Sequence, residues 1–150
     1  MQFNWDYPAP FCIELSPQAS QIDELNHVNN AVYLQWMEDC AWRHSSMLGL
    51  GLDAFTMLNR GMAVLRHEID YLASARPGDQ LILGTWLFKP NGRLKIERRF
   101  QLFNRNSGIC LLRAHTLFVC VELSSGKPKR IPPEFIAAYG KAWREQEASE

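Results

Sequence analysis

The stretch Asn29–Gly51 reads NNAVYLQWMEDCAWRHSSMLGLG and decides the fold of this chain. Its apolar side chains recur mainly at steps of three and four residues, the spacing of one face of an α-helix. These side chains are Tyr33, Trp36, Met37, Cys40, Ala41, Met47 and Leu48. Asn29 or Asn30 can cap the first turn, and Gly49 and Gly51 are typical of a helix end. The pattern predicts one amphipathic helix of about 19 residues with an apolar stripe to bury.

The chain on both sides of this helix alternates apolar and polar residues with the period of β-strands. The expected strands are 11–15 before the helix, and 63–71, 81–88, 94–102 and 109–122 after it. Residues 52–61 are expected to form a loop, and 133–147 a short C-terminal helix. The helix stripe has only this sheet to pack against, so the expected fold class is α+β. The sheet is predicted to be antiparallel, with about five strands curved around one long central helix.

Composition and charge limit the classes of function. The 150 residues are 47% hydrophobic and 21% charged, which predicts a single globular domain over 1–150. Lys and Arg together number 16, as do Asp and Glu, so the formal net charge is zero and we expect no nucleic-acid partner. The four cysteines form no C-x-x-C pair, and we expect reduced thiols with no metal site.

The chain shows no targeting signal and no motif of a common cofactor enzyme. It has neither a basic segment followed by an apolar run at its start nor an apolar stretch long enough to cross a membrane. We therefore expect a cytoplasmic protein with no membrane partner. No phosphate-binding loop, dinucleotide fingerprint, G-x-S-x-G elbow or H-E-x-x-H pair occurs, and no cofactor is expected.

The most informative polar cluster lies directly before the helix, in the stretch DELNHVNNAVY of residues 23–33. The first N–H groups of a helix have no partner inside the helix and carry partial positive charge, so they suit an oxygen that becomes negative during a reaction. The Asp23 carboxylate, a few residues upstream, could reach the same point. This pairing is typical of acyl transfer. Asp23 could equally be a loop or capping residue, since Asp is favoured near helix starts.

The same stretch resembles the signature of the 4-hydroxybenzoyl-CoA thioesterase family of hot-dog-fold proteins. In that family an Asp, three further residues, a His or similar residue, V-N-N and a Tyr lead into the central helix. This chain has Asp23, His27, Val28–Asn30 and Tyr33 at those places. The resemblance continues through Glu38, Ile69–Leu72, Pro77–Asp79 and Ile131–Pro132, and so covers nearly the whole chain.

The resemblance implies a hot-dog fold and hydrolysis of an acyl thioester, with acyl-CoA or an acyl carrier protein thioester as substrate. Asp23 corresponds to the family's general base or nucleophile, and Asn30 supplies the backbone N–H that polarises the carbonyl. His27 could orient the thioester. The family also forms dimers whose sheets join and whose sites lie between subunits, so a homodimer or homotetramer is expected.

Two positions differ from the family pattern. Members often have a second acid two residues before the catalytic Asp, where this chain has Gln21. Members also often have a Gly before the His position, where this chain has Asn26. Asp23 is therefore expected to act without an acidic partner two residues away.

The remaining candidates each have a structural alternative. Tyr33 is a candidate for substrate contact, but like Trp36 it lies at helical spacing on the apolar stripe and fits the core as well. Glu38 could be a second carboxylate or an interfacial hydrogen-bonding group. Lys129 and Arg130 are the candidates for the phosphates of CoA, although basic residues in a turn are often only solvated.

Two other functions remain open at this point. A non-catalytic acyl-CoA-binding module would use the same pocket to sense an acyl chain. A hydratase or dehydratase on the same fold ranks lower, because the Pro-Gly pattern that follows the His of those enzymes is missing here.

Overall fold

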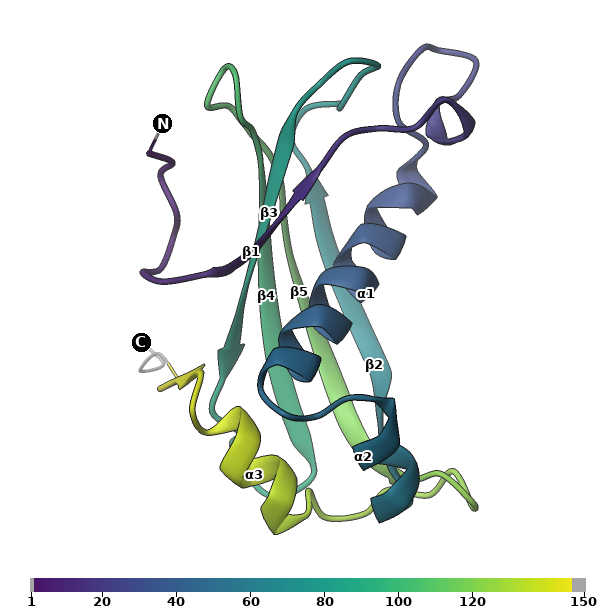
Figure 1. Cartoon of the computed structure of the whole chain (residues 1–150), viewed down its shortest axis with the longest axis vertical. Coiled ribbons are helices and arrows are strands. Elements are labelled where there is room, and N and C mark those ends of the chain that lie inside the picture. Colours follow the sequence, from purple (N-terminus) through teal and green to yellow (C-terminus); the bar gives the residue numbers. More distant parts are fainter. Residues whose placement is uncertain (1, 147–150) are drawn as a thin grey trace. The chain divides into compact units, whose positions relative to one another are not determined.

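A computed structural model describes residues 2–146 of the chain (Figure 1). Its elements, in chain order, are β1 (Phe11–Leu15), a short 3-10 helix (Ala19–Gln21), α1 (Asn30–Met47), α2 (Leu52–Leu58), β2 (Arg60–Tyr71), β3 (Leu81–Phe88), β4 (Lys95–Asn104), β5 (Cys110–Glu122), α3 (Pro133–Tyr139) and β6 (Trp143–Arg144).

The strands form one sheet in the order β1-β3-β4-β5-β2, with β6 added beside β3. β1 and β3 run antiparallel, with Phe11 opposite Thr85 and Leu15 opposite Leu81. The predicted α+β class, with an antiparallel sheet of about five strands and one long helix, is confirmed. β2 lies at one edge of the sheet, so one side of its backbone has no neighbouring strand among the described residues.

The chain divides into two compact units. The first unit holds the chain through Ala41 together with Ile69–Thr85 and Phe100–Ala114. The second unit holds Trp42–Glu68, Trp86–Arg99 and the chain from His115 onward. α1 and the strands β2, β3, β4 and β5 each contribute residues to both units. That residues 1–150 form a single domain stays a prediction.

The first unit has a core built on the beginning of α1. Val32, Met37 and Cys40 of the helix are buried, together with Tyr33 and Trp36. They pack with inward-facing strand residues that include Leu81, Leu83, Phe100, Leu102 and Leu112. Each large apolar side chain buried in this way contributes about 1.5–3 kcal/mol, so the stripe predicted from the sequence anchors this half of the helix.

The second unit has its own core, and here two expectations are corrected. Residues 52–61 are not all loop, because α2 buries Phe55, whose ring lies 4.8 Å from the ring of Phe135 in α3. Asn59, in the left-handed conformation with φ 53°, ends α2. Met47 is 62% exposed and does not belong to the buried stripe. Leu48, one residue later, is buried.

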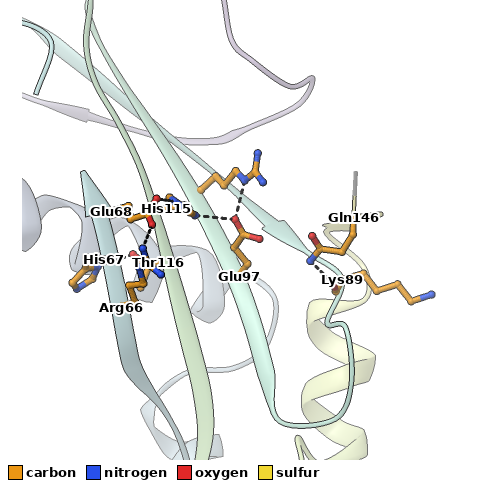
Figure 2. A network of polar contacts seen from close by, with 9 residues as sticks. Arg66, His67, Glu68, Lys89, Glu97, His115, Thr116 and Gln146 are labelled. Atoms are coloured by element: carbon orange, nitrogen blue, oxygen red, sulfur yellow. Dashed lines mark hydrogen bonds and ion pairs between the residues drawn. The ribbon is translucent and has the colours of Figure 1, made fainter. Parts of the chain in front are cut away.

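The C-terminal helix is shorter than the predicted 133–147. α3 ends at Tyr139, because Gly140 caps it and the following chain pairs with the sheet. Trp143 and Arg144 run parallel to Leu87 and Phe88 of β3, and the Lys89 N–H donates to the Arg144 carbonyl at 2.7 Å. Figure 2 shows a further bond, from the Gln146 side chain to the Lys89 carbonyl at 2.7 Å. Residue 147 lies outside the described residues.

A polar ladder joins three strands of the second unit (Figure 2). His115 of β5 contacts Glu68 of β2 through Nε2 at 2.5 Å and Glu97 of β4 through Nδ1 at 3.1 Å. The hydrogen bond from His115, together with the charge of Arg66, holds the pKa of Glu68 below its ordinary value. The ladder ties β4, β5 and β2 together at their solvent-facing side chains.

A second polar pair in this unit is buried. The Arg98 guanidinium donates through Nη1 to Nδ1 of His44 at 2.8 Å, and the two residues are 2% and 4% exposed. His44 must be neutral to accept this bond. Burial, followed by the charge of Arg98, lowers the pKa of His44 to about 4.

This pair predicts that the protein loses stability in mild acid. The unfolded chain binds a proton at His44 near the ordinary pKa of 6.5, whereas the folded chain resists it until about 4. The stabilisation that neutral His44 gives the folded chain is complete above its unfolded pKa. It is lost as the pH falls toward the folded pKa, which lowers the free energy of unfolding by up to about 3 kcal/mol. Urea unfolding of the wild type and of His44→Gln, which keeps an acceptor for Arg98 but does not titrate, measures it. If the free energy of unfolding changes with pH in the same way for the wild type and for His44→Gln, His44 is not the cause of the acid sensitivity.

Candidate active site

Residues 21–29 of the first unit form a tight turn that leads directly into α1. The Asp23 N–H donates to the His27 carbonyl at 2.8 Å, and the Asn29 N–H donates to the Gln21 carbonyl at 2.9 Å. Between these bonds Ile22 and Val28 form an antiparallel bridge. Asn26 takes the left-handed conformation with φ 61°. Asn tolerates this conformation better than most residues, so it satisfies the geometry that a Gly would supply at this place.

Asp23 uses one carboxylate oxygen to hold the turn. Its Oδ1 accepts the N–H of Leu25 at 2.9 Å and the N–H of His27 at 3.2 Å. Within the described residues no donor reaches Oδ2. Of the two structural roles considered from the sequence, Asp23 therefore has the loop role and does not cap α1, because the N–H groups that it binds precede the helix.

The start of α1 leaves one N–H group available. Asn29 is the capping residue, because its Oδ1 accepts the Ala31 N–H at 3.0 Å and its carbonyl accepts the Val32 N–H at 2.9 Å. The Asn30 N–H, between them, has no acceptor among the described residues. A free N–H at a helix start carries partial positive charge and suits an oxyanion. The turn thus brings a free carboxylate oxygen and a free N–H into one short segment of the first unit.

His27 lies in the same turn, held by its backbone. Its side chain is partly exposed, and no described residue forms a hydrogen bond with the ring. The ring is therefore accessible, and its predicted role in orienting substrate stays a prediction.

Tyr33 lies one helical turn after Asn30 and is 3% exposed. Its hydroxyl accepts the Ala75 N–H at 3.0 Å, and its ring packs edge-on against Trp36 and Tyr71. Burial is the main cause that raises the pKa of Tyr33, and the nearby acids Asp23 and Asp79 raise it further. The hydroxyl thus stays protonated well above neutral pH. The geometry gives Tyr33 a structural bond, and its contact with substrate stays a prediction.

Two residues of this region were not singled out from the sequence. Tyr71 donates from its hydroxyl to the Asn30 carbonyl at 3.3 Å, and Ala75 is fully buried beside the turn. Tyr71 lies inside the stretch Ile69–Leu72 that supports the family resemblance, but its role depends on a partner far away in the chain. Ala75 acts through its backbone, which residue identity does not reveal.

The predicted CoA contacts, Lys129 and Arg130, belong to the second unit. The Lys129 ammonium lies 3.4 Å from Oε2 of Glu122. The backbone N–H of Lys129 donates to the Cys120 carbonyl at 2.9 Å. Arg130 is exposed. The structure therefore groups Asp23, His27, Asn30 and Tyr33 in one unit, and both basic candidates in the other. Their contact with the nucleotide stays a prediction.

Residues 2–146 contain neither a group of metal-binding side chains nor a helix that could span a membrane. In that range no three His, Cys, Asp or Glu side chains lie close enough to hold a metal ion. No helix there is long and apolar enough to cross a membrane.

The sequence of the chain is similar to those of known proteins. The profile of the Thioesterase-like superfamily matches residues 17–139. A protein of Bacillus subtilis (strain 168) named "Putative acyl-CoA thioesterase YneP" is 27% identical over 134 residues, which is 86% of this chain and 94% of that protein.

Solved structures share the fold. Slr0204, a 1,4-dihydroxy-2-naphthoyl-CoA thioesterase from Synechocystis, superposes with a TM-score of 0.79 at 20% identity over 88% of this chain and 96% of its own. SAV2348 from Staphylococcus aureus, solved in complex with CoA, gives 0.80 at 19% identity over 95% and 90%. The class of protein defined here is a hot-dog thioester hydrolase. By the profile match, the chain belongs to the Thioesterase-like superfamily.

The two hydrogen bonds of Asp23 Oδ1 predict a stability difference between two substitutions. Asp23→Ala loses both bonds and should lower the free energy of unfolding by about 1 kcal/mol or more. Asp23→Asn keeps a side-chain oxygen that can accept the same N–H groups, so it should cost much less. Urea unfolding of both variants checks this, and equal losses would contradict the turn-holding role.

Proposed function

We propose that this protein hydrolyses acyl-CoA thioesters to the free acid and CoA, with Asp23 and the Asn30 N–H as its catalytic groups. The observation that carries the proposal is that the turn before α1 is held by some polar atoms of Asp23 and Asn29, while Oδ2 of Asp23 and the Asn30 N–H have no partner among the described residues. Asp23 holds the turn with Oδ1 and keeps Oδ2 free, while Asn29 caps Ala31 and leaves the Asn30 N–H free. A carboxylate and an oxyanion donor are the two groups that thioester hydrolysis needs.

The proposed reaction requires no cofactor. The acyl carbonyl oxygen accepts the Asn30 N–H, and Asp23 removes a proton from a water that attacks the carbonyl carbon. The tetrahedral intermediate collapses as the carbon–sulfur bond breaks, and the proton passes to the thiolate or to solvent. Direct attack by Asp23, followed by hydrolysis of the anhydride, uses the same groups. Because a thiolate leaves readily, no strong general acid is needed.

CoA thioesters are the proposed substrate class on the strength of the family and of its relatives' names. YneP is named "Putative acyl-CoA thioesterase" and Slr0204 a 1,4-dihydroxy-2-naphthoyl-CoA thioesterase, while SAV2348 was solved with CoA. Lys129 and Arg130 are the proposed contacts for the phosphates, as point charge and fork respectively. A carrier-protein thioester is the alternative form of the same substrate chemistry.

We also propose that two copies of the chain associate. β2 is an edge strand, and an edge with unpaired N–H and C=O groups is stabilised by pairing with a second copy. In such a dimer, Asp23 of one chain and Asn30 of the other would act on one substrate.

The first test replaces the carboxylate. Asp23→Asn should lower kcat by about 10³-fold, because it removes the proton acceptor or nucleophile. It keeps the oxygen that holds the turn, so the loss is not one of folding. Thiol release from a panel of short, long and aromatic acyl-CoAs measures the rate. Tight binding of acyl-CoA without release by the wild type, at every chain length, would overturn the enzyme in favour of an acyl-CoA sensor.

The second test removes the backbone donor. Asn30 is the first residue of α1, a position where proline is tolerated, so Asn30→Pro deletes the N–H while the helix remains. We expect kcat to fall by about 10²–10³-fold. Ala31→Pro is not a suitable control, because the Ala31 N–H serves the cap. Gln35→Ala, an exposed helix substitution, is the matched control and should keep wild-type activity.

Mixing the two inactive variants tests whether the site is shared. If Asp23 and Asn30 act from different chains, a mixed dimer of Asp23→Asn and Asn30→Pro has one intact site. Refolding an equal mixture should then restore about a quarter of wild-type activity, since half the dimers are mixed. No restoration in a mixture shown to exchange subunits would place both groups on one chain.

A further inference from the structure

A chain of hydrogen bonds in the first unit links α1 to the turn that precedes it. The Ala75 N–H donates to the Tyr33 hydroxyl at 3.0 Å. The carbonyl of the same residue accepts the Val28 N–H at 2.9 Å. Tyr33 lies three residues after Asn30, and Val28 lies two residues before it. Ala75 therefore bridges the two sides of the helix start.

The bridge is isolated from water. Ala75 is fully buried, and Val28 and Tyr33 are almost fully buried as well. A buried N–H without an acceptor costs more than the bond itself contributes, so the three groups hold one another in a single arrangement. The Tyr33 ring is also fixed, by edge-on packing against Trp36 at 5.3 Å and Tyr71 at 5.5 Å.

The bridge acts on the two groups proposed for catalysis. Val28 pairs with Ile22, the residue directly before Asp23, so a shift of Val28 moves the Asp23 backbone. Asn29 and Asn30 follow Val28 directly, so the same shift turns the Asn30 N–H. Tyr71 holds the other side of Asn30, by donating to its carbonyl at 3.3 Å.

We propose that Tyr33 is a positioning residue for thioester hydrolysis: its hydroxyl fixes Ala75, and Ala75 fixes Val28, so that the Asp23 carboxylate and the Asn30 N–H each keep their place in the turn. The proposal rests on the function proposed above. It assigns the Tyr33 hydroxyl to the protein's own backbone rather than to substrate. Misplacement of reacting groups by about 1 Å can cost about 10²-fold in rate, so a single bond in this bridge can matter.

The test variant is Tyr33→Phe, which removes the hydroxyl and keeps the ring between Trp36 and Tyr71. Tyr139→Phe is its matched control. Tyr139 is also a buried tyrosine, 4% exposed, and its hydroxyl bonds Ser45 at 3.2 Å in the second unit. Each variant loses one buried hydroxyl bond, so urea unfolding should show comparable losses of stability.

The kinetic readout separates positioning from substrate contact. For Tyr33→Phe we expect kcat to fall about 10-fold or more, with KM within about 3-fold of wild type. For Tyr139→Phe we expect both constants to stay within about 2-fold. A rise in KM at constant kcat would assign the hydroxyl to substrate and overturn the proposal. If kcat is equal in Tyr33→Phe and Tyr139→Phe, the Tyr33 hydroxyl affects the rate no more than any other buried hydroxyl bond, and the positioning role is overturned.

Amide hydrogen exchange gives a readout that needs no activity. In the wild type the Ala75 and Val28 amides should be protected, and in Tyr33→Phe the Ala75 amide should exchange about 10-fold faster. A wild type in which the Ala75 amide exchanges like an exposed one would show that the bridge does not form, whatever the variant does.

The two proposals fail differently. A wild type that releases no thiol from any thioester overturns the proposed function, and with it any catalytic consequence of the bridge. A wild type that is active and loses its activity in Asp23→Asn, but not in Tyr33→Phe, overturns the positioning role alone.

Discussion

The turn before α1 must satisfy its own backbone and still leave two polar groups unpaired. The N–H and C=O groups of a turn need partners where they are buried, because an unpaired buried group costs free energy. In this turn Val28 is buried, whereas residues 24–26 and 29 are exposed. Residues 21–29 meet this need with three backbone bonds, the cap of Asn29 and the Oδ1 atom of Asp23. Among the described residues, neither Oδ2 of Asp23 nor the Asn30 N–H has a hydrogen-bond partner. The proposed chemistry depends on these two unpaired groups.

In the proposed mechanism, the same residues serve stability and chemistry through different atoms. Asp23 stabilises the turn through Oδ1 and offers Oδ2, and Asn30 begins the helix while its N–H stays open. Tyr33 contributes its ring to the core and its hydroxyl to the Ala75 N–H. A substitution that changes only one atom can therefore separate the two roles, whereas truncation to Ala removes both.

Much of the fold follows from local patterns in the sequence. The period of α1 and the alternation of the strands fix the element types, and Asn29 marks the helix start. The missed elements lack such a signal. α2 is seven residues long with one buried side chain, too short for a helical period to stand out, and β6 is two residues that pair with β3. The motif indicated Asp23 and Asn30 as candidates, whose catalytic roles stay predictions. It did not indicate the Tyr33–Ala75–Val28 bridge, because the central residue of the bridge contributes only backbone.

The two departures from the family pattern have a common explanation in the turn. Gln21 takes part through its carbonyl, which accepts the Asn29 N–H, and any residue supplies a carbonyl. Asn26 adopts the left-handed conformation that a Gly would adopt. Both residues thus take part in the backbone arrangement that holds Asp23, and the uncharged Gln21 places no second acid beside the proposed site. One carboxylate and one N–H can then suffice. Proton transfer contributes about 10²–10⁴-fold and an oxyanion donor about 10²–10³-fold, and a thiolate leaves without the help of a second acid.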